Sequence, residues 1–353
     1  MTLEITTSRS VQRKPRNLFP SGYGACATAR LPSDDPVVPK KAPRTCLSAR
    51  KRLALFTYSV FWPWFAGVAF LILGAISVRG EFAAAAGLDK VVVLGRIFAA
   101  SALACFGAEH MVNIMAFSPG VPSWIPFHPF WIVFVGLALL AGALSLAANR
   151  YTRLSTTLLA VMLFIFVLTL HIPRVFASHD RISWAVVLRD SAFAGGFLAF
   201  AGSQGSGSKL AVFIGRLINA IAFIFFSIMH VLHPQNTPGV PLAKLTPAWM
   251  PWPHVLATIT ALLLLTAGAT ILIDRFARDA AACLGLWMVI LTLVLYVPIF
   301  FTDSGVEQLT EGFNYIFDTL LFAGTILLLA AALPKARAFD RVLRPVAASH
   351  VTT

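Results

Sequence analysis

The sequence predicts an all-α, polytopic membrane protein with about nine transmembrane helices. Of its 353 residues, 58% are hydrophobic and only 12% are charged, whereas about 25% of the residues in a soluble domain are charged. The hydrophobic residues also occur in long blocks, and about 20 mostly apolar residues are enough for a helix to cross a bilayer. We therefore expect a multi-pass protein of the cell membrane whose main partner is the lipid bilayer.

Nine such blocks follow one another, separated by short polar links such as "NRYTR" and "DRFARD". The first block contains "FWPWF", in which the proline would kink a helix or mark its beginning and the tryptophans suit a membrane interface. The expected spans are residues 54–77, 91–116, 128–148, 155–175, 186–202, 210–232, 253–273, 279–301 and 313–333.

Short strings recur in the same order in the two halves of the chain. "PSWIP" (122–126) returns as "PAWMP" (247–251), and "LHIP" (170–173) returns as "LYVP" (295–298). A conserved order of matches indicates an internal duplication, here of a four-helix unit. Because four is even, both units would enter the membrane in the same direction, as parallel repeats. The predicted architecture is two parallel four-helix-bundle repeats plus one N-terminal helix.

Composition divides the chain into five segments. The first holds most of the excess behind the net charge of +13 and has few aromatic residues, which predicts disorder and contact with anionic lipid head groups. It resembles no nucleic-acid-binding fold, so we expect no nucleic-acid partner. The segments are the basic tail (1–52), an extra N-terminal helix with its linker (53–90), the first unit (91–204), the second unit (205–334) and a basic C-terminal tail (335–353).

The distribution of charge favours one orientation. Lysine and arginine gather in the links on one side of the repeats and in the C-terminal tail, whereas the other side is acidic at Asp303, Glu307 and Glu311. Cytoplasmic loops are rich in lysine and arginine, so the C-terminus is predicted to be cytoplasmic. Nine spans then place the basic tail outside, which conflicts with residues 50–52. Either the first block does not cross, or the tail is not native sequence, or the topology is frustrated.

Several ionisable residues of the predicted spans fall near one membrane face, the extracytoplasmic face in this orientation. Such groups are costly in a membrane and usually find partners inside the bundle. We predict the pairs Asp190 with His110 and Asp318 with His230. Each pair could relay a proton, or hold a quinone carbonyl or an anionic substrate; a purely structural hydrogen bond is the alternative. The candidate polar site comprises Glu109, His110, His171, Arg174, Arg189, Asp190, His230, Tyr296 and Asp318.

Two tryptophan loops are predicted at the same face. Their prolines prevent the flanking helices from continuing, and their tryptophans would anchor the interface or form a wall of a ligand cleft. The loop residues are Pro122, Trp124, Pro126, Pro247, Trp249 and Pro251. Arg96 and Arg216 are expected at the opposite face, with their side chains reaching lipid phosphates.

Signatures of other chemistries are missing or incomplete. Haem is disfavoured, because there is no CxxCH motif and Tyr296 replaces a second histidine in the second unit. His230, His233 and His254 suggest a metal site only weakly, so no metal is assigned. The chain has no P-loop, no HExxH motif and no nucleophile beside a base, which argues against a soluble type of enzyme. We assign no catalytic residue, and whether the protein is an enzyme stays open.

In its ordered motifs the sequence resembles the DoxX-like family of four-helix membrane proteins. The resemblance rests on "GAEH" (107–110), "VPSWIP" (121–126), "LHIP" (170–173) and "RDSAFAGGFLAFAG" (189–202), with a looser second set that includes "FDTLLFAG" (317–324). It implies a four-helix bundle and, in some members, association with membrane redox systems that include quinone-linked ones. The duplication, the extra helix and the basic tail depart from the usual single unit.

Three functions stay open at this stage. The favoured one is a quinone- or redox-linked membrane subunit, with quinone as the candidate cofactor and a membrane redox protein as the candidate partner. The alternatives are a transporter or channel for a small solute, which the duplication favours, and a membrane scaffold without catalytic activity. The sequence identifies no substrate, electron partner or oligomeric state.

Overall fold

The computed structural model describes residues 57–240, 242–302 and 306–335. The chain divides into two units, Met1–Ala42 and Pro43–Thr353, and every described residue belongs to the second. The predictions for the basic tail at 1–52, and for the C-terminal tail beyond residue 335, therefore concern residues outside the described part.

Helices form most of the described chain. The one β-type pairing among the described residues is an isolated bridge between Asn236 and Leu245. Nine helical stretches within the described ranges are long and apolar enough to span a membrane, which confirms the all-α membrane class. They are α2 (Tyr58–Ala84), α3 (Asp89–Val112), α5 (His128–Ala148), α6 with α7 (Thr152–Phe166 and Ile172–Ser178), α8 (Arg181–Ser203), α9 (Lys209–Leu232), α10 (Pro253–Ile273), α11 with α12 (Ala277–Leu291 and Val297–Thr302) and α13 (Val306–Ala332). The short α4 (Ile114–Phe117) and a 3₁₀ turn (Ser118–Gly120) follow α3.

Two of these helices extend further than their hydropathy indicates. The first predicted span ended at 77, but α2 continues to Ala84, and Glu81 in its last turn pairs with Arg96 of α3 at 2.6 Å. The last predicted span began at 313, but α13 begins at Val306. A helix end that carries polar residues on one face lowers the average hydropathy without ending the helix.

Two long helices contain a π-helical segment at corresponding places. Val167–His171 joins α6 to α7, and Thr292–Tyr296 joins α11 to α12. Pro173 and Pro298 follow these segments two residues later. Proline has no N–H group and clashes with the carbonyl four residues earlier in an α-helix, and the wider π turn relieves that clash while the helix continues.

Helices of the second half match those of the first at a constant spacing. α5 begins at His128 and α10 at Pro253, which is a spacing of 125 residues, and both are 21 residues long. The same spacing separates α6 from α11 and one π-helical segment from the other. Each of α5 and α10 is preceded by an aromatic residue in the left-handed region, Phe127 with φ of 58° and Trp252 with φ of 48°.

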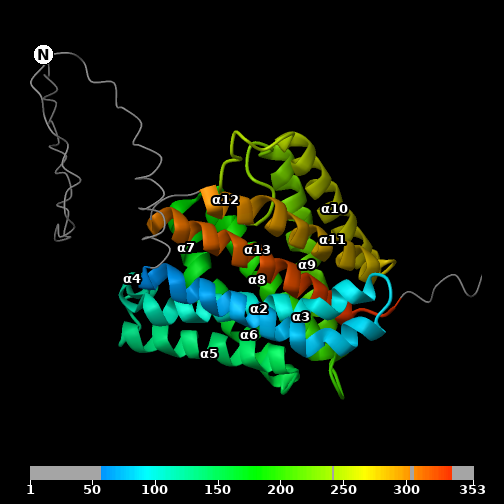
Figure 1. Cartoon of the computed structure of the whole chain (residues 1–353), viewed down its shortest axis with the longest axis horizontal. Coiled ribbons are helices and arrows are strands. Elements are labelled where there is room, and N and C mark those ends of the chain that lie inside the picture. Colours follow the sequence, from blue (N-terminus) through cyan, green and yellow to red (C-terminus); the bar gives the residue numbers. More distant parts are fainter. Residues whose placement is uncertain (1–56, 241, 303–305, 336–353) are drawn as a thin grey trace, which may run out of the picture. The chain divides into compact units, whose positions relative to one another are not determined.

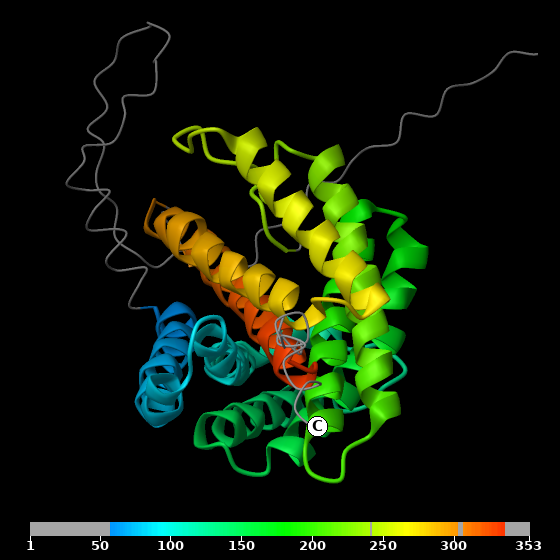
Figure 2. The same ribbon diagram turned by 90° about the vertical axis from the view of Figure 1, so that its right-hand side faces the viewer.

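The most buried helices, α8 and α13, run through the centre of the helix assembly (Figures 1 and 2). α3 packs against α13, α8 packs against α9, and α8 and α13 also contact each other. Within the described ranges, α3 makes no extended contact with α8. The first helix of each predicted unit thus packs on the last helix of the other. The two predicted four-helix units therefore interleave. The first predicted unit does not close into a bundle of its own, because α3 and α8 make no extended contact, whereas α9 and α13 of the second make a limited one.

Glycines permit the close crossings at the centre. A Cβ added to Gly324 of α13 would lie 2.5 Å from the backbone nitrogen of Ala99 on α3, and one added to Gly196 of α8 would lie 2.6 Å from the carbonyl oxygen of Thr325 on α13. Small residues at such positions let helix backbones approach closely in a membrane. These contacts fix the relative positions of the helices that carry the ionisable residues.

Candidate functional site

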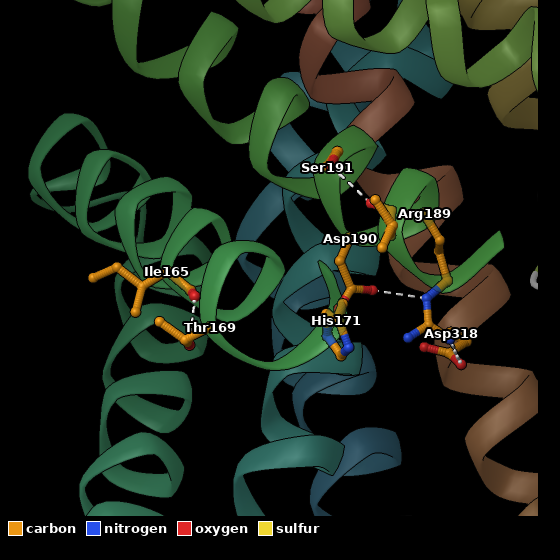
Figure 3. Close-up of polar contacts among 8 residues, drawn as sticks. Ile165, Thr169, His171, Arg189, Asp190, Ser191 and Asp318 are labelled. Atoms are coloured by element: carbon orange, nitrogen blue, oxygen red, sulfur yellow. Dashed lines mark hydrogen bonds and ion pairs between the residues drawn. The ribbon is translucent and has the colours of Figure 1, made fainter. Parts of the chain in front are cut away.

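Four ionisable side chains form a continuous chain between α8, α13 and the end of a π-helical segment (Figure 3). His171 Nε2 lies 2.8 Å from Asp190 Oδ2, and Arg189 Nε donates to Asp190 Oδ1 at 2.8 Å. Arg189 Nη1 donates to Asp318 Oδ2 at 2.6 Å. These side chains are between 9% and 21% exposed. We refer to His171, Asp190, Arg189 and Asp318 as the central ion-pair chain.

The central ion-pair chain connects the two predicted units. Arg189 and Asp190 belong to α8 of the first unit, and Asp318 belongs to α13 of the second. The guanidinium is a planar fork whose donors point in different directions, so Arg189 can bond to its own neighbour through Nε and to the facing helix through Nη1. Phe193, one turn further along α8, places its ring 5.7 Å from the Arg189 Cζ atom.

The predicted pairs Asp190–His110 and Asp318–His230 are wrong. Each histidine instead bonds through Nδ1 to the carbonyl four residues earlier in its own helix, at 2.8 Å for His110 and 2.7 Å for His230. Both carboxylates bind Arg189, which is always charged and offers several donors. A buried carboxylate gains more from that cation than from a neutral imidazole.

In the second unit, the residues that match the histidine positions bind the chain's own loop. Residues 236–240 of the loop between α9 and α10 are buried. The Gly239 N–H donates to His230 Nε2 at 3.1 Å, and the Tyr296 hydroxyl donates to the Pro238 carbonyl at 3.1 Å. Gly239 has φ of 143°, and a Cβ there would collide with the Tyr296 hydroxyl. Within the described chain, His230 and Tyr296 therefore bond to a backbone segment and to no charged group.

Two open grooves reach the ends of the central ion-pair chain. The acidic groove, of about 480 Å³, runs along α13, and its described lining is Glu307, Thr310, Glu311, Asn314, Tyr315 and Asp318. The histidine groove, of about 310 Å³, lies where α7 meets the start of α8, and its described lining is His171, Arg174, Asp180, Ile182, Ser183 and Val186.

Both grooves use corresponding faces of corresponding helices. The spacing of 128 residues that separates Asp190 from Asp318 also relates three lining residues of one groove to three of the other. These are Ile182, Ser183 and Val186 in the histidine groove, and Thr310, Glu311 and Asn314 in the acidic groove. The positions correspond but the chemistry differs, because the first set is mainly apolar and the second is polar and acidic.

Glu109 joins the same cluster through an amide. This carboxyl group is 4% exposed, and its Oε1 accepts a hydrogen bond of 3.1 Å from Asn314 Nδ2. Asn314 lies one helical turn before Asp318 on α13 and lines the acidic groove. Among the described residues Glu109 has no cationic partner.

The remaining predicted site residues lie at the surface of this end of the helices. Arg174 is exposed and makes no hydrogen bond or ion pair within the described chain. Trp124 and Trp249 are 72% and 47% exposed, and the loops that carry them, 122–126 and 247–251, contribute no described lining residue to either groove.

The expectation that Arg96 reaches lipid phosphates is wrong, and Arg216, expected to do the same, has a carboxylate partner within the protein. Arg96 is 6% exposed and pairs with Glu81, and Arg216 pairs with Asp274 at 2.9 Å. The extended α2 and the helix end at 274 bring a carboxylate to each guanidinium, and a nearby carboxylate within the protein satisfies the charge without lipid.

Asp180, in the turn between α7 and α8, caps α8. Its Oδ1 accepts from the Ser183 N–H at 2.9 Å, and its Oδ2 accepts from the Ser183 hydroxyl at 2.7 Å. Hydrogen bonds from the hydroxyls of Ser178 and Ser183 hold the pKa of Asp180 well below its usual range. The cap fixes the first turn of the helix that carries Arg189.

Sequence reasoning named only Asp318 of the acidic groove as a site residue, and it missed Glu307, Thr310, Glu311, Asn314 and Tyr315. Glu307, Glu311, Asn314 and Asp318 recur every three or four residues, which is the spacing of one helical face. The sequence contained this signal. It was missed because the predicted span began at 313, which placed Glu307 and Glu311 outside the helix and Asn314 and Asp318 inside it.

No group of three or more histidine, cysteine, aspartate and glutamate side chains is placed to hold a metal ion within the described ranges. His230 and His233 in particular do not combine with His254 into such a group. Comparison with protein-family models, with curated proteins and with solved structures finds no match to this chain.

Proposed function

We propose that this protein is a DoxX-like membrane protein that binds a quinone head group in the histidine groove and serves a membrane redox system. The central ion-pair chain is the observation that carries the proposal. Ionised groups inside a membrane are expensive and most often mark a functional site. Here the cluster ends in two grooves that a small molecule can enter, which a purely structural role would not require.

The residues of the histidine groove suit a quinone. A quinone has a planar, largely apolar ring with two carbonyl oxygens, so its site needs apolar walls and hydrogen-bond donors. Ile182 and Val186 provide apolar walls, and His171 and Arg174 provide polar atoms. Nδ1 of His171 and the guanidinium of Arg174 have no partners in the described chain. When bound, a quinone would supply the capacity to carry two electrons with two protons.

The protein side chains would bind and orient that head group. Asp190 holds the Nε2 side of the His171 ring, and Arg189 holds Asp190. The His171 Nδ1 atom can then donate to a carbonyl when the ring is protonated, or accept from a hydroxyl when the ring is neutral. Arg189 and Asp190 are therefore positioning residues in this proposal, and an electron partner would be a separate membrane protein.

We also propose that the chain arose by duplication of a four-helix unit. Support comes from the 125-residue spacing of three consecutive helical elements and from the matching left-handed residues before α5 and α10. The two units would be related by an axis along the membrane normal. The proposed orientation keeps the C-terminus in the cytoplasm and both grooves at the extracytoplasmic face, as the distribution of lysine and arginine favours.

The test is quinone binding by the full chain purified in mild detergent. Co-purified quinone is extracted and quantified, and a photoreactive quinone analogue is then cross-linked to the protein and mapped by mass spectrometry. We expect labelling around His171 and a loss of at least tenfold in binding for His171→Asn. The matched control is His254→Asn, a histidine outside both grooves, which should bind as the wild type does. Unchanged binding in His171→Asn would refute the proposal.

A small-solute transporter is the second candidate, favoured by the correspondence of the two grooves across the interface between the units. Transporters built from repeats often place their substrate at such an interface. Solute flux into vesicles reconstituted with the wild type, and its loss in Asp318→Asn, would support this reading. Absence of flux together with stoichiometric quinone would leave the first proposal standing alone.

A further inference from the structure

We propose that Glu109, Asn314 and Asp318 form a binding site for one monovalent cation at the inner end of the acidic groove. The cation is a proton carried by Glu109 or a sodium ion held by oxygen atoms of the three residues. This inference concerns the end of the central ion-pair chain remote from His171, and it does not depend on the quinone proposal.

The first argument is the balance of charge. Among the described residues, the buried cluster contains three carboxyl groups, on Glu109, Asp190 and Asp318, and one permanent cation, Arg189. Even when His171 is protonated, one negative charge has no compensating positive charge. An uncompensated charge in a membrane interior costs several kcal/mol, so the cluster favours uptake of one more positive charge.

The second argument is that Glu109 and Asn314, which share a hydrogen bond, and Asp318, one turn further along α13, carry oxygen atoms without partners in the described chain. Asn314 Oδ1 is buried and accepts no hydrogen bond within the described chain. Glu109 accepts only one bond there, at Oε1, and Asp318 accepts only at Oδ2. Buried polar atoms are normally satisfied by protein, water or a ligand. A cation, or a proton shared between oxygens, would satisfy these atoms together.

The third argument is access. Asn314 and Asp318 line the acidic groove, whose outer turns carry Glu307 and Glu311. From Glu307 to Asp318 the helix rises about 16 Å at 1.5 Å per residue. A cleft with carboxylates along its wall concentrates cations and draws them inward. Glu311 is paired with an ammonium group, since its Oε2 lies 3.3 Å from Lys244 Nζ. Its charge is partly compensated, so Glu307 contributes more to the negative potential of the groove.

The donors favour a single charge over a divalent metal ion. Calcium and magnesium take six or more oxygen ligands with several carboxylates, whereas this site offers two carboxyl groups, one of which also binds Arg189. The site is incomplete as a divalent centre, but it suits a proton or a sodium ion.

Other titratable groups lie near this end of the helices packed around Glu109, and any pH effect has to be separated from theirs. They are Cys105 and His110 on α3, Tyr58 on α2, His128 on α5, and Glu307, Glu311, Tyr315 and Asp318 on α13. A comparison of wild type with Glu109→Gln isolates the contribution of Glu109, because the substitution preserves shape and removes the titratable group.

The experiment measures the infrared carboxyl band and thermal unfolding of the full chain in detergent at neutral pH. Sodium chloride is exchanged for choline chloride at constant ionic strength. The variants are Glu109→Gln and the control Glu307→Gln, which removes the same group at the mouth of the groove. Asn314→Ala is included as a second route to the site, because loss of the amide should shift the frequency of a Glu109 carboxyl band.

Two results support the proposal and distinguish its two forms. A protonated-carboxyl band in wild type and Glu307→Gln, absent from Glu109→Gln and insensitive to sodium, identifies the proton. A rise in the unfolding midpoint with sodium, lost in Glu109→Gln and Asn314→Ala, identifies the sodium ion. A carboxyl band that persists in Glu109→Gln, or the absence of both the band and the sodium effect in wild type, overturns the site.

Discussion

Replacing Arg189 by methionine should destabilise the folded protein strongly, because this one side chain balances two buried carboxylates on different helices. Methionine is shorter than arginine but of similar volume, unbranched and uncharged, so the change removes the contacts of 2.8 Å to Asp190 and 2.6 Å to Asp318 with little loss of side-chain volume. Loss of one partner from a buried ion pair costs about 3–5 kcal/mol, mainly because the other charge is left buried and uncompensated. We expect a loss of that order in the free energy of unfolding.

The assay is equilibrium unfolding in mixed micelles of a mild detergent and dodecyl sulfate, followed by circular dichroism. The matched control is Arg216→Met, since Arg216 pairs with Asp274, whose side chain is 54% exposed. An exposed pair contributes only about 0–1 kcal/mol, and the lost hydrogen bond to the Ile271 carbonyl adds about 1 kcal/mol. Equal losses in the two variants would refute the reasoning.

A rescue variant separates loss of charge balance from loss of packing. Arg189→Met combined with Asp190→Asn and Asp318→Asn removes every member of the two ion pairs. The main cost of breaking a buried ion pair is the charge left without a partner, and the triple variant leaves none, so most of the lost stability should return. If the triple variant is as unstable as the single one, the guanidinium acts through packing and not through its charge.

Two further predictions concern helix packing and pH. Gly324→Ala should lower the free energy of unfolding by about 1–3 kcal/mol, because its Cβ would lie 2.5 Å from the Ala99 backbone. Gly80→Ala, whose Cβ meets nothing within 4 Å, should be neutral or stabilising by up to about 1 kcal/mol; similar effects of the two changes would contradict the packing argument. The lowered pKa of Asp180 means that its contribution to stability is present above the unfolded pKa of about 3.9 and declines as pH falls below it toward the folded-state value. Thermal unfolding at pH 3–7 should therefore show the advantage of wild type over Asp180→Asn shrinking at acid pH, and an advantage independent of pH would contradict this.

The membrane class and the approximate positions of the spans could be predicted from sequence, because apolar blocks of membrane length need no tertiary information. Members of the central ion-pair chain could also be named, since ionisable residues in apolar blocks are conspicuous. The partners of these ionisable residues could not be predicted. The contact of Arg189 with Asp318 depends on α8 crossing α13 of the other unit, which follows from close approach at Gly196, a feature of three-dimensional packing. Without knowledge of that crossing, it was simpler to assume that each aspartate pairs with a histidine of its own predicted unit.

The difference between the two halves also had a signal in the sequence. The spacing between matched residues is 120 at His110 and His230 but 125 at Trp124 and Trp249, so the second loop is five residues longer. That longer loop contains the buried residues 236–240, of which Pro238 and Gly239 contact Tyr296. An insertion in one copy of a repeat is thus a marker for a place where the copies have diverged in structure.

If the chain arose by the proposed duplication, the asymmetry follows naturally from having both copies in one chain. Two identical subunits would present identical sites, so a change that helps one site and harms the other could not be confined to one of them. In a single chain, one copy can keep a groove with His171 and Arg174 while the other acquires carboxylates along α13. The second copy also places its own loop, residues 236–240, against His230 and Tyr296. The interleaved packing of α3 with α13 and of α8 with α9 then keeps both grooves attached to the same buried charges. On the proposed functions, a quinone in one groove and a cation in the other would act on one shared cluster. Occupation of either groove should then change the affinity of the other, by the same factor in both directions.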